Sequence, residues 1–598
     1  MHLLRRKFFI VRSNLFGVAA LLLILSACKN SGSQSEAGPA DSIRLNQLGF
    51  YPNAPKTGIV LGDDLRDFEI RSVDQSEVVF KGVLSQAVKS DFSDKKYQTA
   101  DFSELTNEGR YVLVIPGAGQ SYPFEIRRNV HQELAKAAIK NYYFQRMSIP
   151  LGERFAGTWA RPAGHPDTRI LVHESAASDA RPVGTVLSAP KGWYDAGDYN
   201  KYVVNSGITM GTMLAAYEDF PLYYAEVELN IPESGNGVPD LLDEIRWNLR
   251  WLLAMQDPND GGVYHKLTNP GFDGMVMPHE ATKERYVVQK GTSAALNFAA
   301  VTAQAGRIYK DFEQQFPGLA DSCVAASKRA WKWAIENPDV LYEQEKLNKQ
   351  FNPDIVTGAY GDRDLKDEFA WAASELFVTT RDKTFLEYLP VSEVTFQLPS
   401  WNQVRALGYY SILRFADQLN ESVPAHLDAI RTQLVSFVNE LGEGVESRAF
   451  RTVMGRSARD YIWGSSSVAA NQGVALIQAY RITDDKRYLD LTLSNLDYLL
   501  GRNATGYSFV TGFGSKTPMH PHHRPSEADG IPEPIPGMLS GGPNPGMQDK
   551  CNYPSAIAEE AFVDDVCSYA SNEIAINWNA PLIYLSGAVE ALQTKAGH

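Results

Sequence analysis

The spacing of apolar residues along the chain changes once, close to residue 129, and this change divides it into two kinds of structure. Before it, apolar and polar residues alternate in short runs separated by turn residues, at 43–48, 58–61, 68–73, 78–84 and 111–115. A period of two is typical of strands with one buried face. Residues 42–128 are therefore predicted to form a small β-sandwich. They contain no cluster of His, Asp or Glu with catalytic spacing. A role as a module that packs against and spaces the rest of the chain is therefore favoured over a binding role.

Beyond His131 the apolar residues recur at helical spacing. One face of the segment 241–253 carries Leu241, Leu242, Ile245, Leu249, Leu252 and Leu253. Ten further helices are predicted to begin near His131, Tyr202, Ala294, Leu319, Leu365, Trp401, Pro424, Ser465, Asp485 and Glu573. No sequence period repeats, which favours a closed α/α barrel over residues 129–598 rather than a solenoid. Its long loops are expected to carry the chemistry.

The charge of the chain excludes one class of partner. With 57 basic and 71 acidic residues among 598, the net charge is −14, so no basic surface is available to neutralise phosphates and nucleic acid is not expected to bind. Neutral or cationic substrates are favoured. Aromatic residues make up 11% of the chain, enough to supply stacking surfaces for sugar rings, although core packing accounts for most of them equally well.

The first residues carry the features of an export signal. Arg5, Arg6 and Lys7 precede an apolar run at 15–25 that is too short to span a bilayer but suits a signal peptide. Leu25-Ser26-Ala27-Cys28 resembles a bacterial lipobox, which implies a signal peptide at 1–27, lipidation of Cys28 and a flexible tether at 28–41. Lys29, rather than Asp, implies sorting to the outer membrane of a Gram-negative bacterium. An ordinary secretory signal is the alternative.

Three further cysteines remain. Cys551 and Cys567 could pair in an oxidising compartment, and closing so short a loop would contribute about 3 kcal/mol. Cys323 lies in a predicted helix, where it is expected to be buried and free. The cysteines and histidines show no zinc-binding spacing.

Two carboxyl groups flank a glycine at 195–198. Asp195 and Asp198 are three residues apart, and Gly197 permits a tight turn that would direct both side chains to one place. Acids this close push their pKa values apart, which suits a general base and its partner. A helix cap before Tyr202, or a calcium loop, would explain the same residues.

Two other segments contain residue types that suit catalysis. Pro518 and Pro521 keep 518–524 out of a helix, so His520, His522, His523 and Arg524 are expected on a loop, where the three histidines leave zinc as an alternative. Glu573 precedes a long apolar helix, and its simplest interpretation is a first-turn residue that stabilises the helix dipole. Neighbouring aromatic residues and Asp564 could instead raise its pKa towards that of a general acid.

Together the three segments resemble glycoside hydrolase family 9, in the bacterial branch with an immunoglobulin-like domain before an (α/α)6 barrel. One family signature is filled by Ser508, Val510, Thr511, Gly514, Lys516, Pro521, His522 and Arg524. The other is filled by Phe562, Asp564, Tyr569, Glu573, Ala575, Asn579 and Ala580. The resemblance extends over nearly all of the chain after the signal segment.

The resemblance implies an inverting mechanism, in which the two carboxyl groups lie about 6.5–9.5 Å apart to admit a water molecule. Asp198 matches the general base, Asp195 its helper and Glu573 the general acid. The matching substrate contacts are His522, Arg524, the stacking residues Trp463 and Trp578, and His265, with a supporting role for Asp564.

The resemblance also bears on metals, none of which the chemistry requires. Three of the four residues of the family's zinc site are replaced, by Met147, Gly164 and Tyr194, and only His165 is kept, so no zinc is expected. The family's calcium site resembles 361–368, with candidate ligands Asp362, Asp364, Asp367 and Glu368. Asn402 and Gln403 stand where a further Asp is expected, and a solvated helix start is the alternative.

The predicted function is that of an endo-acting β-1,4-glucanase, acting as a monomer on soluble, mixed-linkage or decorated glucans. An exo-acting β-glucosidase or β-glucosaminidase on the same fold is the nearest alternative. A surface glycan-binding protein that has lost catalysis, or a metal-dependent hydrolase built on the histidines, is less favoured.

Overall fold

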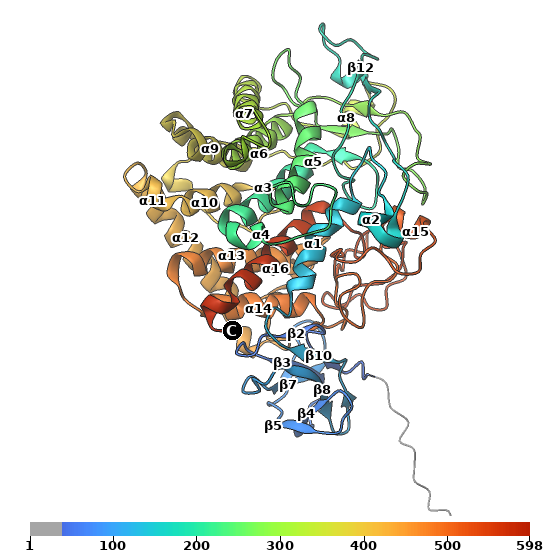
Figure 1. Cartoon of the computed structure of the whole chain (residues 1–598), viewed down its shortest axis with the longest axis vertical. Helices are drawn as coiled ribbons and strands as arrows, with labels where there is room; N and C mark the ends of the chain where they lie inside the picture. The colour runs from blue at the N-terminus through green and yellow to red at the C-terminus, as the bar shows by residue number, and fades with distance from the viewer. Residues whose placement is uncertain (1–38) are drawn as a thin grey trace, which may run out of the picture. The chain divides into compact units, whose positions relative to one another are not determined.

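A computed structural model of the protein describes residues 39–598 (Figure 1). The predicted signal peptide at 1–27, Cys28 and residues 28–38 of the tether lie outside the described residues. Within the described part, none of the helices is long and apolar enough to cross a membrane.

Two sheets packed face to face form the N-terminal domain, as predicted. The first has the order β1 (Ile43–Arg44), β3 (Thr57–Leu61), β7 (Lys96–Asp101), β6 (Val88–Lys89). The second has the order β2 (Gly49–Phe50), β10 (Phe124–Ile126), β8 (Gly109–Ile115), β4 (Asp67–Ser72), β5 (Val78–Val83), and β9 (Gly119–Gln120) also pairs with β8. Phe68, Ile70, Leu113 and Phe124 pack between the sheets. Strand β7 was not predicted, because it contains the buried polar residues Gln98 and Thr99. The side chain of Gln98 donates to the carbonyls of Leu65 and Ser85.

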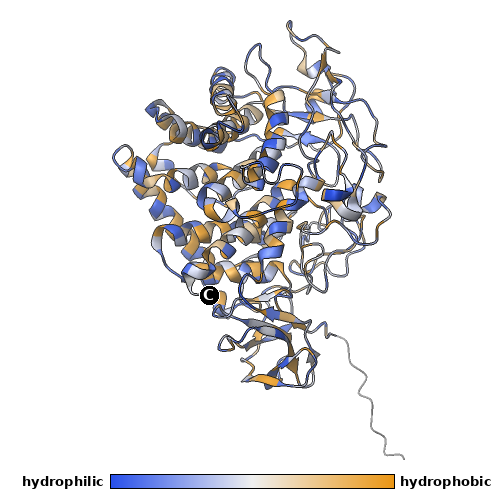
Figure 2. Cartoon of the chain, in the orientation of Figure 1, coloured by the Kyte–Doolittle hydropathy of each residue, from blue (hydrophilic) through white to orange (hydrophobic). Residues whose placement is uncertain are grey.

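The second domain is an (α/α)6 barrel, as predicted, and each of the eleven expected helices is present. In the described residues, the helices of ten residues or more are α1 (Gln132–Phe144), α3 (Val203–Asp219), α5 (Asp240–Ala254), α6 (Thr292–Tyr309), α7 (Leu319–Glu336), α9 (Lys366–Thr380), α10 (Arg405–Arg414), α12 (Pro424–Gly442), α13 (Ser465–Thr483), α14 (Arg487–Leu499) and α16 (Ile576–Ala596). Shorter helices are α2 (Glu153–Ala156), α4 (Pro221–Ala225), α8 (Gln344–Asn348), α11 (Ala416–Leu419) and α15 (Arg524–Ala528). Hydrophobic residues recur along the helices of the barrel (Figure 2), and α3, α6, α9, α13 and α16 pack against one another or their neighbours through them.

The last helix begins later than the sequence suggested. Glu573 lies three residues before Ile576, the first residue of α16, so the first-turn interpretation of Glu573 is wrong. The backbone at this point is extended, because Glu573 pairs with His522 and Ile574 pairs with Ser540. Its side chain is therefore available for chemistry rather than for the helix dipole.

A small sheet at one end of the barrel was not predicted. Its order is β12 (Val186–Leu187), β11 (Ile170–Val172), β15 (Tyr286–Val287), β14 (Lys266–Thr268), β13 (Lys201–Tyr202). Strands of two or three residues leave too little alternation to detect in a sequence. The sheet fixes the loop 195–200, because β13 follows that loop directly and pairs with β14 through Tyr202 and Lys266.

The sandwich contacts the barrel through specific hydrogen bonds. Gln47 Oε1 accepts from the backbone nitrogens of Ser515 and Lys516, both at 2.8 Å, and its Nε2 donates to the carbonyl of Gly506. Asn46 donates to Asp497 at 2.8 Å. Residues of the first domain thus support the loop 506–516, which leads into the His522 segment.

Candidate active site

Asp195 and Asp198 lie on the loop between Trp193 and β13, and both carboxyl groups are buried. Asp198 Oδ2 accepts from Asn200 Nδ2 at 2.5 Å and from the hydroxyl of Tyr202 at 2.9 Å. The structure rules out the helix-cap alternative, since no side chain caps α3. Both hydrogen bonds go to one oxygen of Asp198, so the other oxygen is available to accept from a water molecule.

Asp195 is held by two donors from different parts of the chain. Asn205 Nδ2 donates to one carboxylate oxygen at 2.7 Å, and the hydroxyl of Tyr360 donates to the other at 2.8 Å. Burial and the negative charge of Asp198 raise the pKa of Asp195 well above its usual value, while the bonds from Asn205 and Tyr360 oppose that rise. These two donors therefore favour the ionised form that a base's partner requires.

Glu573 reaches the same loop from the other end of the sequence. The backbone nitrogen of Gly197 donates to Glu573 Oε1 at 3.3 Å. Loss of water around the carboxyl group, and then the negative charges of Asp198 and Asp195, raise the pKa of Glu573 well above its usual value. A carboxyl group in this environment keeps its proton near neutral pH, as a general acid must.

Gly197 is required where the two halves of the site meet. A Cβ at this position would lie 2.3 Å from the carbonyl oxygen of His522 and 2.7 Å from its ring. The guanidinium of Arg524 donates to the carbonyl of Gly197 at 2.5 Å and to that of Asp273 at 3.0 Å. Arg524, which is buried, thus holds the aspartate loop, and its predicted contact with a sugar stays a prediction.

His522 is oriented by a backbone carbonyl. Its Nδ1 donates to the carbonyl oxygen of Val566 at 2.6 Å, which leaves Nε2 for another partner. Burial lowers the pKa of His522, so the ring is neutral near pH 7. Asp564 does not join the catalytic carboxyl groups. It accepts from the backbone nitrogens of Met519 and His520 and from Asn572, so it shapes the loop that carries His522.

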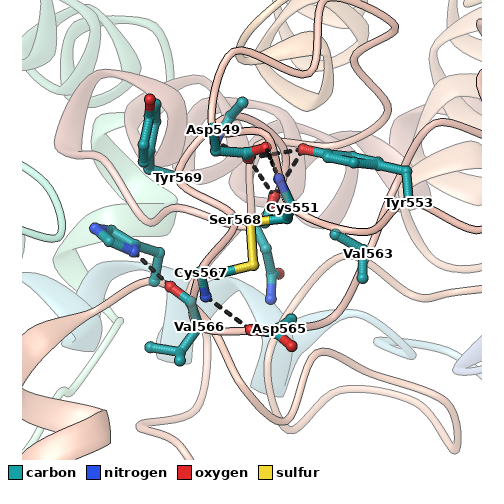
Figure 3. The surroundings of a disulfide bond; sticks show 12 residues. Asp549, Cys551, Tyr553, Val563, Asp565, Val566, Cys567, Ser568 and Tyr569 are labelled. Carbon is teal, nitrogen blue, oxygen red and sulfur yellow. Dashed lines mark hydrogen bonds between the residues drawn. A yellow bond between two sulfur atoms is a disulfide. The ribbon is translucent and has the colours of Figure 1, made fainter.

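A disulfide closes the loop that supplies this carbonyl (Figure 3). Cys551 and Cys567 are bonded, as the sequence allowed, and Cys323 is buried and free. Val566 is the immediate neighbour of Cys567, and Cys567 donates to Asp565 at 2.8 Å. Asp549 ties the same loop together by accepting from Ser568, Tyr553 and the nitrogen of Ala570. The cross-link therefore restrains the segment that orients His522.

The predicted aromatic platforms lie in different environments. Trp463 is 42% exposed, and its ring is 5.4 Å from that of Tyr569, which in turn contacts His522. Trp578 is half-buried against Gly464. His265 is fully buried, stacks on Tyr342 and hydrogen-bonds the carbonyl of Ala359. Its ring has no surface from which to contact a sugar, so that prediction is corrected to a packing role beneath Tyr360.

Sequence reasoning missed the residues that hold the aspartates. Tyr360 has a left-handed backbone, with φ of 46°, which is costly outside glycine and is found at functional sites. Lys266 is fully buried and donates to the carbonyl of Gly358 at 2.7 Å and to the Thr357 hydroxyl at 3.0 Å. It thereby fixes the segment before Tyr360. No local pattern marks either residue, because their side-chain hydrogen-bond partners are 78 or more positions away along the chain.

The candidate metal ligands are not gathered into one shell. In residues 39–598, no group of three or more His, Cys, Asp or Glu side chains is placed to hold an ion. His520 is exposed while His523 is buried against Gln145, so the histidines do not converge. His165 hydrogen-bonds Tyr194 at 3.1 Å. At the calcium candidate, Asp364 is exposed, but both oxygens of Glu368 and one of Asp362 are buried with no hydrogen-bond partner in the described part of the chain.

Two protein-family models match the chain, one over each of its two domains. The family model described as Glycosyl hydrolase family 9 matches residues 131–586, and the Cellulase N-terminal ig-like domain matches 39–120. The chain belongs to glycosyl hydrolase family 9. It is thus a glycoside hydrolase. Of the residues that carried the resemblance, His522, Arg524 and Glu573 contact Gly197 in the aspartate loop.

Relatives match over almost the full length. A xyloglucan-specific endo-β-1,4-glucanase of Bacteroides ovatus is 46% identical over 580 residues, covering 97% of this chain and 98% of the relative. Endoglucanase D of Acetivibrio thermocellus is 32% identical, covering 92% and 83%. A solved structure described as Bacteroides ovatus GH9 superposes with a TM-score of 0.88 at 45% identity. The match covers 93% of this chain and 100% of that chain.

Proposed function

We propose that this family 9 hydrolase is an endo-β-1,4-glucanase that cleaves branched glucans of the xyloglucan type with inversion. The hydrogen bond between Gly197 and Glu573 carries the proposal, because it brings the acid to the loop of the two aspartates. The relatives named as endo-β-1,4-glucanases, one of them xyloglucan-specific, support the choice of polymer.

The residues divide the reaction between the two halves of the site. Glu573, held in its protonated form, gives a proton to the leaving glycosidic oxygen. Asp198 takes a proton from the attacking water. Asp195 helps to hold this water through the carboxylate oxygen that also accepts the hydrogen bond from Tyr360. The neutral His522 offers Nε2 as an acceptor for a sugar hydroxyl.

Digestion of xyloglucan tests the proposal. We expect viscosity to fall early, before many reducing ends appear, and the first product seen by ¹H NMR to be the α-anomer. Release of monosaccharide alone would favour an exo-acting β-glucosidase or β-glucosaminidase, and an initial β-anomer would contradict inversion. Binding of xyloglucan without any hydrolysis would support the alternative of a glycan-binding protein that has lost catalysis.

We also propose a structural calcium ion at Asp362, Asp367 and Glu368, whose carboxylates would have to draw together around it, since they form no ion-binding group in the part of the chain that the structure describes. The buried oxygens of Glu368 have no partner in the described residues, and burial, with the charge of Asp367, raises the pKa of Glu368. A hard cation would supply the missing partner. It would take no part in the reaction.

The N-terminal signal motif supports a further proposal, that the enzyme is lipid-anchored at Cys28 in the outer membrane and acts there as a monomer. The Cys28→Ala chain should then leave the membrane fraction in a Gram-negative host. Its continued recovery with membranes would contradict lipid anchoring.

A further inference from the structure

A hollow of about 530 Å³ is lined by residues that have no role in the mechanism above. It is bounded by the loop 396–403 on one side and the loop 456–460 on the other, with Gln472 of α13 and Phe437 and Leu441 of α12 at its base. Its volume falls in the range of small-molecule sites, about 300–1,000 Å³.

Both loops lead directly to the active site. Asn402 and Gln403 follow Trp401, whose ring is 5.4 Å from that of Tyr360, the donor to Asp195. On the other side, Arg459 and Asp460 precede the exposed Trp463 by a few residues. The loop 396–403 is held to α13, the helix that follows the loop 456–460, because Asn471 of α13 donates to the carbonyl of Pro399. The lining residues of the hollow therefore lie within a few positions of Trp401, which contacts Tyr360, and of Trp463.

The lining is that of a site for a neutral, hydroxyl-rich ligand. Three groups have no hydrogen-bond partner in the described residues: the amide nitrogens of Asn402 and Gln472 and the guanidinium of Arg459. Phe396 and Phe437, with ring centroids 6.2 Å apart, provide an apolar surface. Amides, one guanidinium and an aromatic surface suit a pyranose ring.

The charges argue against an anion. The carboxylate of Asp460 also lines the hollow, and Arg456 forms an ion pair with Glu440 at 2.7 Å. An adjoining hollow of about 560 Å³ shares both arginines but is lined by Asp91, Glu440 and Glu443 and by no aromatic side chain. It offers a control site with the same arginines and without the sugar-binding surface.

From these observations we infer that the hollow between 396–403 and 456–460 binds a single pyranose branch of a substituted β-1,4-glucan whose main chain lies across the catalytic residues. The inference rests on the proposed function and adds a determinant of specificity to it. Asn402 and Arg459 bind the hydroxyls of the branch, and Phe396 contacts its apolar face.

Kinetics on matched substrates test the inference. Asn402 and Arg459 are exposed, so the double variant N402A/R459A is expected to fold normally. On a xylose-branched cello-oligosaccharide its KM should rise at least about fivefold, since two hydrogen bonds are lost, with kcat unchanged. On cellohexaose both constants should match the wild type. Glu443→Gln, in the adjoining hollow, should change neither substrate's kinetics.

Binding separates this inference from the proposed function. Calorimetry measures the affinity of the same branched oligosaccharide for a Glu573→Gln chain, with and without N402A/R459A. This measurement does not depend on hydrolysis of the ligand. Weaker binding of the branched ligand alone supports the branch site, even if xyloglucan proves not to be the substrate. Equal binding by the two chains, or equal weakening for branched and linear ligands, would overturn it.

Discussion

Replacing Tyr360 with Phe should remove one of the two hydrogen bonds that hold Asp195 in its ionised form. The hydroxyl donates to Asp195 at 2.8 Å, and hydrogen bonds to charged groups contribute about 1.5–3 kcal/mol. Because Tyr360 is half-buried, we take the lower part of this range, about 1.5–2 kcal/mol. This corresponds to a rise of roughly one pKa unit in Asp195 and a loss of about 10- to 30-fold in kcat.

The pH profile distinguishes this effect from a general loss of structure. Burial and Asp198 already raise the pKa of Asp195, and loss of the Tyr360 bond raises it further. The carboxylate is the form that holds the water, so it is populated only at higher pH in the variant. The acid limb of kcat on a soluble glucan should therefore move to higher pH, by about one unit.

Tyr410→Phe is the matched control. Tyr410 is buried in the barrel, and its hydroxyl has no hydrogen-bond partner in the described residues, so its removal should leave both kcat and the profile unchanged. If Tyr360→Phe keeps kcat within twofold of the wild type, or if its acid limb coincides with that of the control, then Tyr360 does not hold Asp195 in its ionised form.

The other predictions concern the catalytic carboxyl groups, the cross-link and the cation. Glu573→Gln and Asp198→Asn should each lower kcat by about 10²–10⁴-fold with unchanged circular dichroism, and near-normal turnover by either would contradict its role. Reduction of the Cys551–Cys567 disulfide removes about 3 kcal/mol of loop restraint. It should lower kcat/KM, because the Val566 carbonyl that orients His522 is then less restrained. The C551S/C567S chain should not respond to reductant. Chelation should lower the melting temperature, with recovery on adding calcium; a Glu368→Gln chain that still responds would place the ion elsewhere.

The sequence predicted the fold well where periodicity is long. Eleven helices were expected, and each is found as a helix of ten residues or more that buries apolar side chains. The short strands β11 to β15 were not predicted because two or three residues carry no measurable period. The start of α16 was misplaced because the apolar run begins before the backbone becomes helical, while Glu573 still pairs with His522.

Within the site, the residues that act on substrate were predictable and those that position them were not. Asp195, Asp198 and Glu573 lie in spaced motifs that resemble a family. Tyr360 and Lys266 lie in unremarkable segments, and only the fold brings them to the aspartate loop. His265 was misassigned for the same reason, because a histidine in a sequence motif gives no sign of how deeply its ring is buried.

The bonds of Gln47 and Asn46 have a consequence for the evolution of this enzyme. Exchange of the sandwich for an unrelated module of the same shape would remove the hydrogen bonds that Ser515, Lys516 and Asp497 form with it. Substitutions on either side of this contact must therefore be compatible with the other, and the two domains are expected to be inherited as a pair rather than shuffled separately.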